Sequence, residues 1–432
     1  MNLEINSLCT DAWMTLIQLS LWKKQTSACQ ILNNEDDKLW RSVFEEMKAH
    51  AIAVLPARIL PALSLPPDLY EEWEAFILQK VRQNLRCRHE ESRLPRTLTV
   101  PYVILKGTSA AKYYPYPEFR TMGDIDIMTR QEDYAMACEM LLQGGYQEIT
   151  SFGDQKRGRH RAFRKGDVVV EVHLFFASMN DVDRARTMDE YILRNIPELP
   201  LNNMDGPLKE DTQPGWRNSH VLPDLVNGLV LIEHINQHLE KGLGLRQIID
   251  WMMFVDKCLP DEKWPDFQAM ATKTGMETLA VTVTRMCEMY LGLSARNWSA
   301  DADEHLCTQL MEYILACGDF GSKHAAQNSD HNRIMQKLVQ LGTPAAIFVN
   351  LQKKGLMQWE AAQKHAPLRP FAWLYQTGHY LSGMAQDEKK EPRSFWEQYK
   401  EAKQYKDLLD ALGVKQAHKG LVGYSDGKYM KK

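Results

Sequence analysis

The sequence predicts an α+β protein in which a small mixed β-sheet core is flanked by N-terminal and C-terminal helical regions. Apolar residues recur with a period near 3.6 before residue 95 and again from Pro223 onward, which is typical of amphipathic helices. Between these regions the pattern changes to short apolar runs separated by glycine-containing turns, which favours strands. We therefore expect a helical region over residues 1–95, the core over residues 96–200 and a second helical region over residues 201–432 with a mobile tail.

The N-terminal region is predicted to contain amphipathic helices. In residues 36–53 the apolar side chains Leu39, Val43 and Met47 are spaced by four, so they share one helical face. The same pattern returns in residues 69–87, directly after two prolines that suit the start of a helix. At least two helices should therefore precede the core.

The core is predicted to combine short strands with helices. Gly144 and Gly145 should end a helix, and Lys165-Gly166-Asp167 should form the tight turn of a β-hairpin. The expected elements are a strand over residues 102–105, a helix over 107–114, a strand over 125–128, a helix over 131–143, hairpin strands over 162–164 and 168–173, and a helix over 189–195.

The bulk composition is that of an ordinary globular protein. The chain has 432 residues, of which 44% are hydrophobic and 25% charged, so it is long enough for two or three domains. Its formal net charge of −4 provides no electrostatic footprint for extended nucleic acid. The eight cysteines include no CxxC pair, which indicates a reducing cytoplasm. No segment approaches the ~20 apolar residues of a membrane span, so no membrane contact is expected.

Three carboxylates are predicted to share one face of the sheet. Asp124 and Asp126 are two residues apart in a strand and point the same way, while Ile125 and Ile127 point into a core. Glu171 lies in the middle of a second apolar run and would complete the cluster from a neighbouring strand. Clustered carboxylates need cations to neutralise them, and hard oxygen ligands favour Mg²⁺ or Mn²⁺.

Glu171 and the nearby His173 each have more than one interpretation. Glu171 can pair instead with an arginine of the hairpin region, and the candidates are Arg157, Arg159, Arg161 and Arg164. His173 follows on the same face as Glu171, and it can ligate a metal, orient a substrate or hydrogen-bond Glu171. The basic residues 156–161 form either a solvated turn or an anion-binding loop.

Candidate phosphate-binding residues follow the first strand. Lys106 supplies a positive charge, and Gly107 permits close approach of the backbone to a phosphate at the start of a helix. Thr108 and Ser109 can act as helix caps or as phosphate donors. Arg120 can either clamp a triphosphate or lock its loop onto an aspartate.

Two pairs in the second helical region have helical spacing. His234 and His238 lie four residues apart and therefore on one face, but the HExxH pattern of zinc hydrolases is absent. They are expected either to pack in the core or to line the acceptor side of a cleft. Arg246 and Asp250 have the same spacing and are expected to form an ion pair along their helix.

These motifs together resemble a bacterial family of uncharacterised nucleotidyltransferases within the DNA polymerase β-type nucleotidyltransferase superfamily. The resemblance extends from about residue 102 to about residue 255. The matching residues are Leu105-Lys106-Gly107, Tyr113 and Tyr114, Arg120, Asp124-Ile125-Asp126, Glu171-Val172-His173, His234, His238, Arg246 and Asp250. The wider superfamily has Gly-Ser where this chain has Lys106-Gly107-Thr108-Ser109.

The resemblance implies transfer of a nucleoside monophosphate from an NTP, with ATP favoured, to a hydroxyl group. Asp124, Asp126 and Glu171 would be the catalytic carboxylates and would hold two Mg²⁺ ions. The acceptor would be a sugar, another small molecule, a peptide or a protein side chain. The alternatives are an inactive nucleotide-binding protein and a toxin that modifies tRNA or protein.

Overall fold

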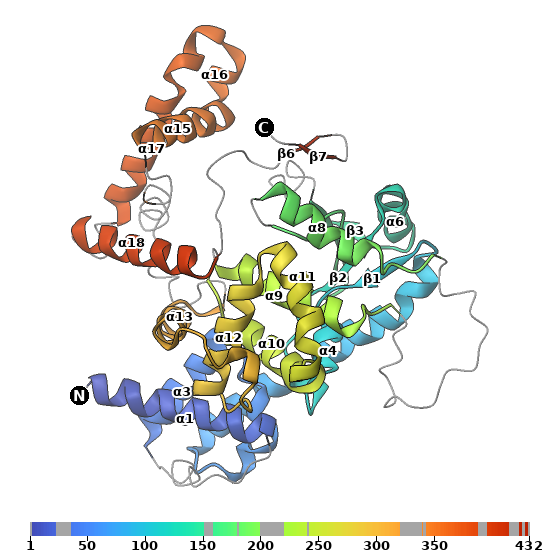
Figure 1. Cartoon of the computed structure of the whole chain (residues 1–432), viewed down its shortest axis with the longest axis vertical. Coiled ribbons are helices and arrows are strands. Elements are labelled where there is room, and N and C mark those ends of the chain that lie inside the picture. The colour runs from blue at the N-terminus through green and yellow to red at the C-terminus, as the bar shows by residue number, and fades with distance from the viewer. Residues whose placement is uncertain are drawn as a thin grey trace.

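The computed structural model describes most of the chain (Figure 1). The described residues are 2–22, 36–150, 159–178, 181–198, 220–239, 242–319, 339, 343–387, 395–413, 423–425 and 428–430. Residues 199–219 and the candidate Arg157 lie outside them. None of the described helices combines the length and the apolar character needed to cross a membrane.

The helices before and within the sheet region are α1 (Asn2–Trp22), α3 (Asp37–Ala49), α4 (Pro67–Thr97), α5 (Thr108–Ala111), α6 (Gln131–Gln143) and α8 (Val182–Leu193). The later helices are α9 (Asp224–Leu239), α10 (Leu245–Cys258), α11 (Trp264–Thr274), α12 (Glu277–Tyr290), α13 (Glu304–Cys317), α15 (Pro344–Gln358), α16 (Glu360–Lys364), α17 (Ala372–Asp387) and α18 (Phe395–Ala411). Short 3₁₀ helices include η1 (Leu55–Arg58), η2 (Leu60–Ala62), η3 (Pro117–Phe119), η5 (Asp261–Lys263), η6 (Asn297–Ser299) and η8 (Ala366–Phe371).

A five-stranded mixed sheet is the centre of the fold, which confirms the predicted α+β class. Its strands are β1 (Tyr102–Ile104), β2 (Ile125–Thr129), β3 (Gln147–Glu148), β4 (His160–Lys165) and β5 (Val168–His173), in the order β1-β2-β5-β4-β3. β2 and β5 are parallel, and the other neighbouring strands are antiparallel. The predicted hairpin joins β4 to β5 through Gly166, whose φ of +58° suits glycine.

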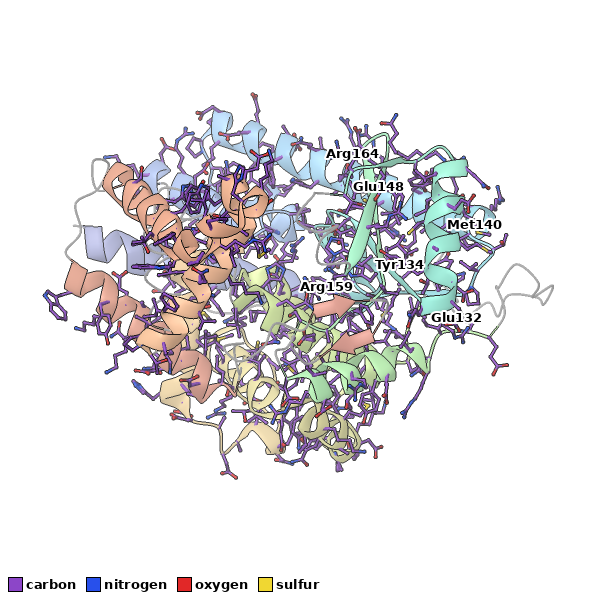
Figure 2. All side chains as sticks on the ribbon, turned by 90° about the horizontal axis from the view of Figure 1, so that it is seen from above. Glu132, Tyr134, Met140, Glu148, Arg159 and Arg164 are labelled. Atoms are coloured by element: carbon purple, nitrogen blue, oxygen red, sulfur yellow. The ribbon has the colours of Figure 1, made fainter. Side chains whose placement is uncertain are left out.

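The two faces of this sheet have different surroundings. Ile125, Ile127, Val170 and Val172 point to one face, where they form an apolar core with residues of α4 and α6. Seen from above, Tyr134 and Met140 on α6 lie at the same end of the molecule as the strand residues Glu148 and Arg164 (Figure 2). The opposite face carries Met128 and, from the same alternation, the acidic residues of the predicted cluster.

The helices that precede the sheet in the sequence and those that follow it share one large apolar core. This core contains residues of α1 and α3, such as Trp13 and Trp40, together with residues of α9 to α13, such as Trp251. In Figure 1, α9 and α10 lie beside the sheet, whereas α15, α16 and α17 extend away from it. A two-stranded sheet of β6 (Gly423–Ser425) and β7 (Lys428–Met430) follows near the C-terminus.

Several element boundaries differ from the predictions for local reasons. The helix expected over residues 107–114 ends at Ala111, because Pro115 disfavours helical backbone in the residue before it and Pro117 follows closely. Helix α8 begins at Val182, well before residue 189, because the Asp181 side chain accepts hydrogen bonds from the first backbone N–H groups. Strand β3 was not predicted, since its two exposed residues have no apolar period.

Candidate metal centre

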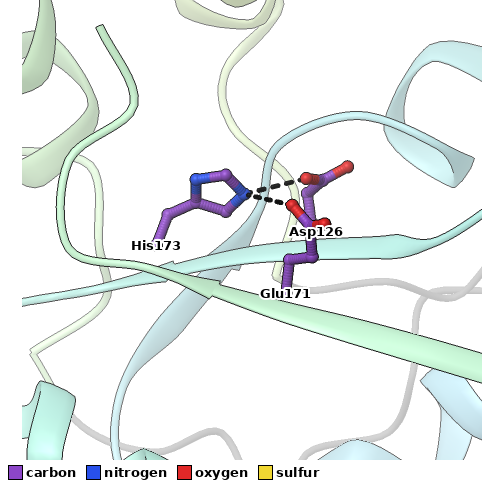
Figure 3. A group of neighbouring side chains, drawn as sticks. All are labelled: Asp126, Glu171 and His173. Atoms are coloured by element: carbon purple, nitrogen blue, oxygen red, sulfur yellow. Dashed lines mark hydrogen bonds and ion pairs between the residues drawn. The ribbon is translucent and has the colours of Figure 1, made fainter. Parts of the chain in front are cut away.

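Parallel pairing of β2 and β5 brings the central acidic residues together. Asp126 is the register partner of Glu171, and Met128 is the partner of His173, so Asp126, Glu171 and His173 project from one face. One ligand atom from each of the three lies within 4.8 Å of the others (Figure 3). Asp126 and His173 are buried, whereas Glu171 is partly exposed.

His173 bridges the two carboxylates. Its Nε2 atom lies 2.8 Å from Asp126 Oδ1 and 3.5 Å from Glu171 Oε2. Burial disfavours the charged imidazole, but contacts with Asp126 and Glu171 outweigh burial and raise the pKa of His173. On the next strand, the Nε2 atom of His160 lies 3.8 Å from Glu171 Oε2.

Lys106, in the turn after β1, contacts the carboxylate of Asp126. The backbone N–H of Leu105 donates to the carbonyl of Asp126, which aligns the end of β1 with β2. The Lys106 Nζ atom then lies 2.9 Å from Asp126 Oδ1. Burial opposes the ionisation of Asp126, but Lys106 and His173 together hold its pKa well below the ordinary value. Lys106 and His173 contact the same oxygen, Oδ1, and Oδ2 forms no hydrogen bond or ion pair with a described residue.

Asp124 lies immediately before β2 and outside the group of three ligand atoms. Repulsion from Asp126, followed by burial, raises the pKa of Asp124 to about 6. Glu171 adds to this repulsion, while Lys106 and Arg246 oppose it. Asp124, Asp126 and Glu171 therefore interact as one electrostatic cluster, although only the latter two share a ligand-sized space with His173.

The donor set fits a hard divalent cation. Two carboxylates and an imidazole can supply three ligands to one ion, and carboxylate oxygens suit a hard divalent cation better than a soft metal. The excess of acidic groups over nearby lysine also favours a cation at this position.

The turn after β1 lies against the segment that leads into β2. Gly107 has a φ of +63°, and a Cβ atom at this position would lie 3.6 Å from the carbonyl oxygen of Asp124. The Thr108 hydroxyl donates to Glu91 Oε2 at 2.5 Å. The Ser109 hydroxyl lies 2.9 Å from the Leu105 carbonyl oxygen. Neither hydroxyl caps α5, and both are buried in these contacts.

Arg120 is held in a buried ion pair outside this cluster. Its guanidinium donates to both carboxylate oxygens of Asp250, at 2.8 and 2.6 Å. The Tyr114 hydroxyl donates to the same carboxylate at 2.7 Å. This geometry corresponds to the second of the two roles considered for Arg120, a lock between its loop and an aspartate. The expected ion pair between Arg246 and Asp250 is wrong, because Arg246 pairs instead with Asp319 at 3.1 Å.

The two histidines of α9 are buried beside each other. The ring centroids of His234 and His238 are 4.6 Å apart, and the rings are nearly perpendicular. Burial, followed by the positive charge of Lys106, holds the pKa of His234 well below its ordinary value. His234 therefore stays neutral near the cluster, whereas His238 lies 3.9 Å from Asp319.

Sequence reasoning missed one neighbour of the cluster, His160, and one contact within the site, that of Lys106 with Asp126. His160 could have been found, because the tight turn at Gly166 makes it the register partner of His173. The contact between Lys106 and Asp126 has no sequence signal, since it depends on how β1 pairs with β2.

Comparisons with known proteins identify the family. Among curated proteins and among solved structures, none matches this chain. A family model described as "Uncharacterised nucleotidyltransferase" matches residues 36–292, which is more than half of the chain and includes the whole acidic cluster. The protein therefore belongs to the uncharacterised nucleotidyltransferase family.

Proposed function

We propose that the protein is a metal-dependent nucleotidyltransferase of the DNA polymerase β type. It would transfer a nucleoside monophosphate from an NTP, with ATP as the proposed nucleotide, to a hydroxyl group of a small molecule, sugar, peptide or protein. The acceptor oxygen forms a bond to the α-phosphorus, the bond from the α-phosphorus to the bridging oxygen breaks, and pyrophosphate leaves. The hydroxyl proton passes to solvent.

The observation that carries this proposal is the group of Asp126, Glu171 and His173 in a member of this family. In the proposal, Asp124, Asp126 and Glu171 hold Mg²⁺ or Mn²⁺, and Glu171 serves the side of the acceptor. A metal held there would lower the pKa of the acceptor hydroxyl and would neutralise charge on the leaving pyrophosphate. His173 either adds a ligand or orients the two carboxylates that it contacts.

The remaining residues align the substrates. Lys106 is 14% exposed beside Asp126, which supports a role for its ammonium group in contacting phosphate oxygens at the metal centre. Gly107, Thr108 and Ser109 would contribute through the backbone of the turn, because both hydroxyls are already bonded within the fold. His234 and its neighbour His238 are proposed to line the acceptor side.

Net charge and cysteine usage limit the class of acceptor and the cellular location that we propose. The net charge of −4 supports a small molecule, peptide or protein as acceptor over extended nucleic acid. The scattered cysteines, which are free thiols wherever they are described, support a cytoplasmic location.

The test is nucleotide transfer by the full chain. The protein is incubated with each α-labelled NTP and Mg²⁺ or Mn²⁺, and both pyrophosphate release and labelled products are measured with pooled hydroxyl acceptors. Binding of ATP with either metal is measured by calorimetry in parallel. Asp126→Asn should abolish the metal-dependent signal, whereas Asp183→Asn, which removes an exposed carboxylate of α8, should retain it.

Three results would separate the alternatives. A folded wild-type protein that binds no NTP with either metal would overturn the proposal. Binding of NTP without transfer to any acceptor would support a regulatory nucleotide-binding protein. Labelling of tRNA or of cellular proteins, together with toxicity on expression, would support the toxin-type enzyme.

A further inference from the structure

The segment that delivers Asp124 to the sheet is mostly irregular. It consists of η3 and residues 120–124, and Asp124 precedes the first residue of β2. Strand pairing therefore aligns Asp126 but does not by itself position Asp124. Contacts outside the sheet must hold this carboxylate against the repulsion that Asp126 exerts on it.

Asn84 on α4 holds this segment through three backbone contacts. Its Nδ2 atom donates to the carbonyl oxygens of Glu118 and Arg120, at 2.8 Å each. Its Oδ1 atom accepts the backbone N–H of Met122 at 2.9 Å. Asn84 is only 1% exposed, so these contacts are shielded from water. One side chain thus satisfies three backbone groups of a segment that has no strand partner.

The side of α4 that carries Asn84 faces the acidic cluster. One turn later, burial raises the pKa of the Cys87 thiol to about 11, and the charge of Asp124 adds to this shift. A further turn along, Glu91 accepts the hydroxyl proton of Thr108 in the turn after β1. Helix α4 therefore contacts both backbone segments that flank Asp124.

A second attachment holds the same segment through helix α10. The carbonyl oxygen of Arg120 is bonded to Asn84, while the guanidinium of Arg120 is bonded to Asp250 on α10. The backbone between Glu118 and Met122 is therefore attached to two helices that are far apart in the sequence. Asp124 lies two residues beyond the last of these attachments.

We propose that Asn84 is a positioning residue, whose three backbone contacts place the carboxylate of Asp124 so that it completes the metal centre with Asp126. The proposal rests on the proposed function, because it assigns to Asp124 a share in metal binding. Asn84 acts through the backbone and touches neither metal nor substrate. Substitution of Asn84 should therefore weaken metal binding when the Asp124 carboxylate is present, and should have little effect when that carboxylate has been removed.

The experiment measures Mn²⁺ binding to the full chain by electron paramagnetic resonance. Asn84→Ala should raise the Kd for Mn²⁺ about tenfold, and Asp124→Asn should raise it at least as much. In the double variant, Asn84→Ala should add less than a twofold change to the effect of Asp124→Asn. If Asn84→Ala only destabilised the fold, its effect on the Kd would be the same with and without Asp124→Asn.

Two matched controls test specificity. Gln83→Ala removes the adjacent side chain of α4, which donates to the backbone of Asp167 in the hairpin turn. Leu141→Ala opens the core beneath the other sheet face and lowers stability, and it removes none of the three hydrogen bonds of Asn84. Both should bind Mn²⁺ within twofold of wild type. If Asn84→Ala does not fold by circular dichroism, Asn84→Ser, which is too short for the three contacts, is used instead.

The outcomes separate this inference from the proposed function. Wild-type protein that binds Mn²⁺, with unchanged affinity in the Asn84 variant, would overturn the positioning role alone. An Asn84 effect that is fully additive with Asp124→Asn would also overturn it. Wild-type protein that binds no Mn²⁺ would overturn the metal centre and the positioning role together.

Discussion

Asp126 and Asp250 are both buried carboxylates in contact with cations, yet their surroundings differ. Each is 1% exposed. Asp250 has one cation, Arg120, bonded to both of its oxygens, and it also accepts the Tyr114 hydroxyl. Asp126 contacts Lys106 and His173 through one oxygen, and its other oxygen contacts none of the described polar groups.

Asp126 and Asp250 also differ in the number of charged side chains around them. Asp124 and Glu171 repel Asp126, whereas Asp250 forms a one-to-one pair whose partner shares both oxygens. A carboxylate that is satisfied on all sides holds elements together. A carboxylate that has acidic neighbours and one oxygen without a polar contact can bind an additional cation. Burial alone therefore does not distinguish a structural carboxylate from a proposed metal ligand.

The largest expected effect is the loss of activity on changing Asp126. Asp126→Asn keeps the side-chain volume but removes the charge at the metal centre. We expect Mg²⁺-dependent transfer to fall on the order of a thousandfold or more, ~4 kcal/mol of barrier. Folding should be retained, because Asp124 and Glu171 still face Lys106. Label transfer and thermal unfolding measure the two effects, and activity near the wild-type level would exclude Asp126 as a ligand.

Asp250→Asn should instead act mainly on stability. It leaves the buried guanidinium of Arg120 without a counter-charge, so we expect a loss of about 3–5 kcal/mol in the free energy of unfolding. Chemical denaturation measures this loss. The comparison between the two aspartates would fail if Asp126→Asn proved the more destabilising of the two.

Asp124→Asn should stabilise the protein without metal, in a pH-dependent way. The pKa of Asp124 is raised to about 6 from an ordinary 3.8, so its charged form destabilises the fold. This cost is absent below about pH 4, grows as the pH rises and is complete above about pH 6. We expect a gain of about 1–2 kcal/mol at pH 7, reduced because Asp124 is partly exposed. Unfolding with a chelator present should show no gain at pH 4, and a pH-independent difference would contradict the repulsion.

The smallest effect is expected at the partly exposed pair of Glu148 and Arg161. The hydrogen bond from Arg161 lowers the pKa of Glu148 to about 2 from an ordinary 4.5. The stabilisation is therefore present above about pH 4.5 and is lost as the pH falls toward 2. Glu148→Gln should cost less than about 1 kcal/mol at pH 7, because water screens both side chains. A loss as large as that of Asp250→Asn would show that burial does not control the strength of these pairs.

Local patterns predicted much of the fold. The apolar runs located β2 and β5, and the glycines at 144 and 145 ended α6 at the predicted residue, Gln143. Pattern reasoning failed where a distant contact decides the structure. Helix α4 was predicted from the apolar pattern over residues 69–87, and it continues to Thr97 because its last turns pack Leu94 into the core beneath the sheet. Propensity alone did not indicate this extension, since Pro95 argues against it.

The sequence by itself determined which residues share a face, and tertiary structure decided which charges meet. Alternation placed Asp126 apart from Ile125 and Ile127, because the side-chain period of a strand is a local property. The partners of Lys106 and Arg120 depended on strand order and on a helix 130 positions away in the chain. Pairing between distant segments is set by register and packing in three dimensions, which leave no periodic trace in the sequence.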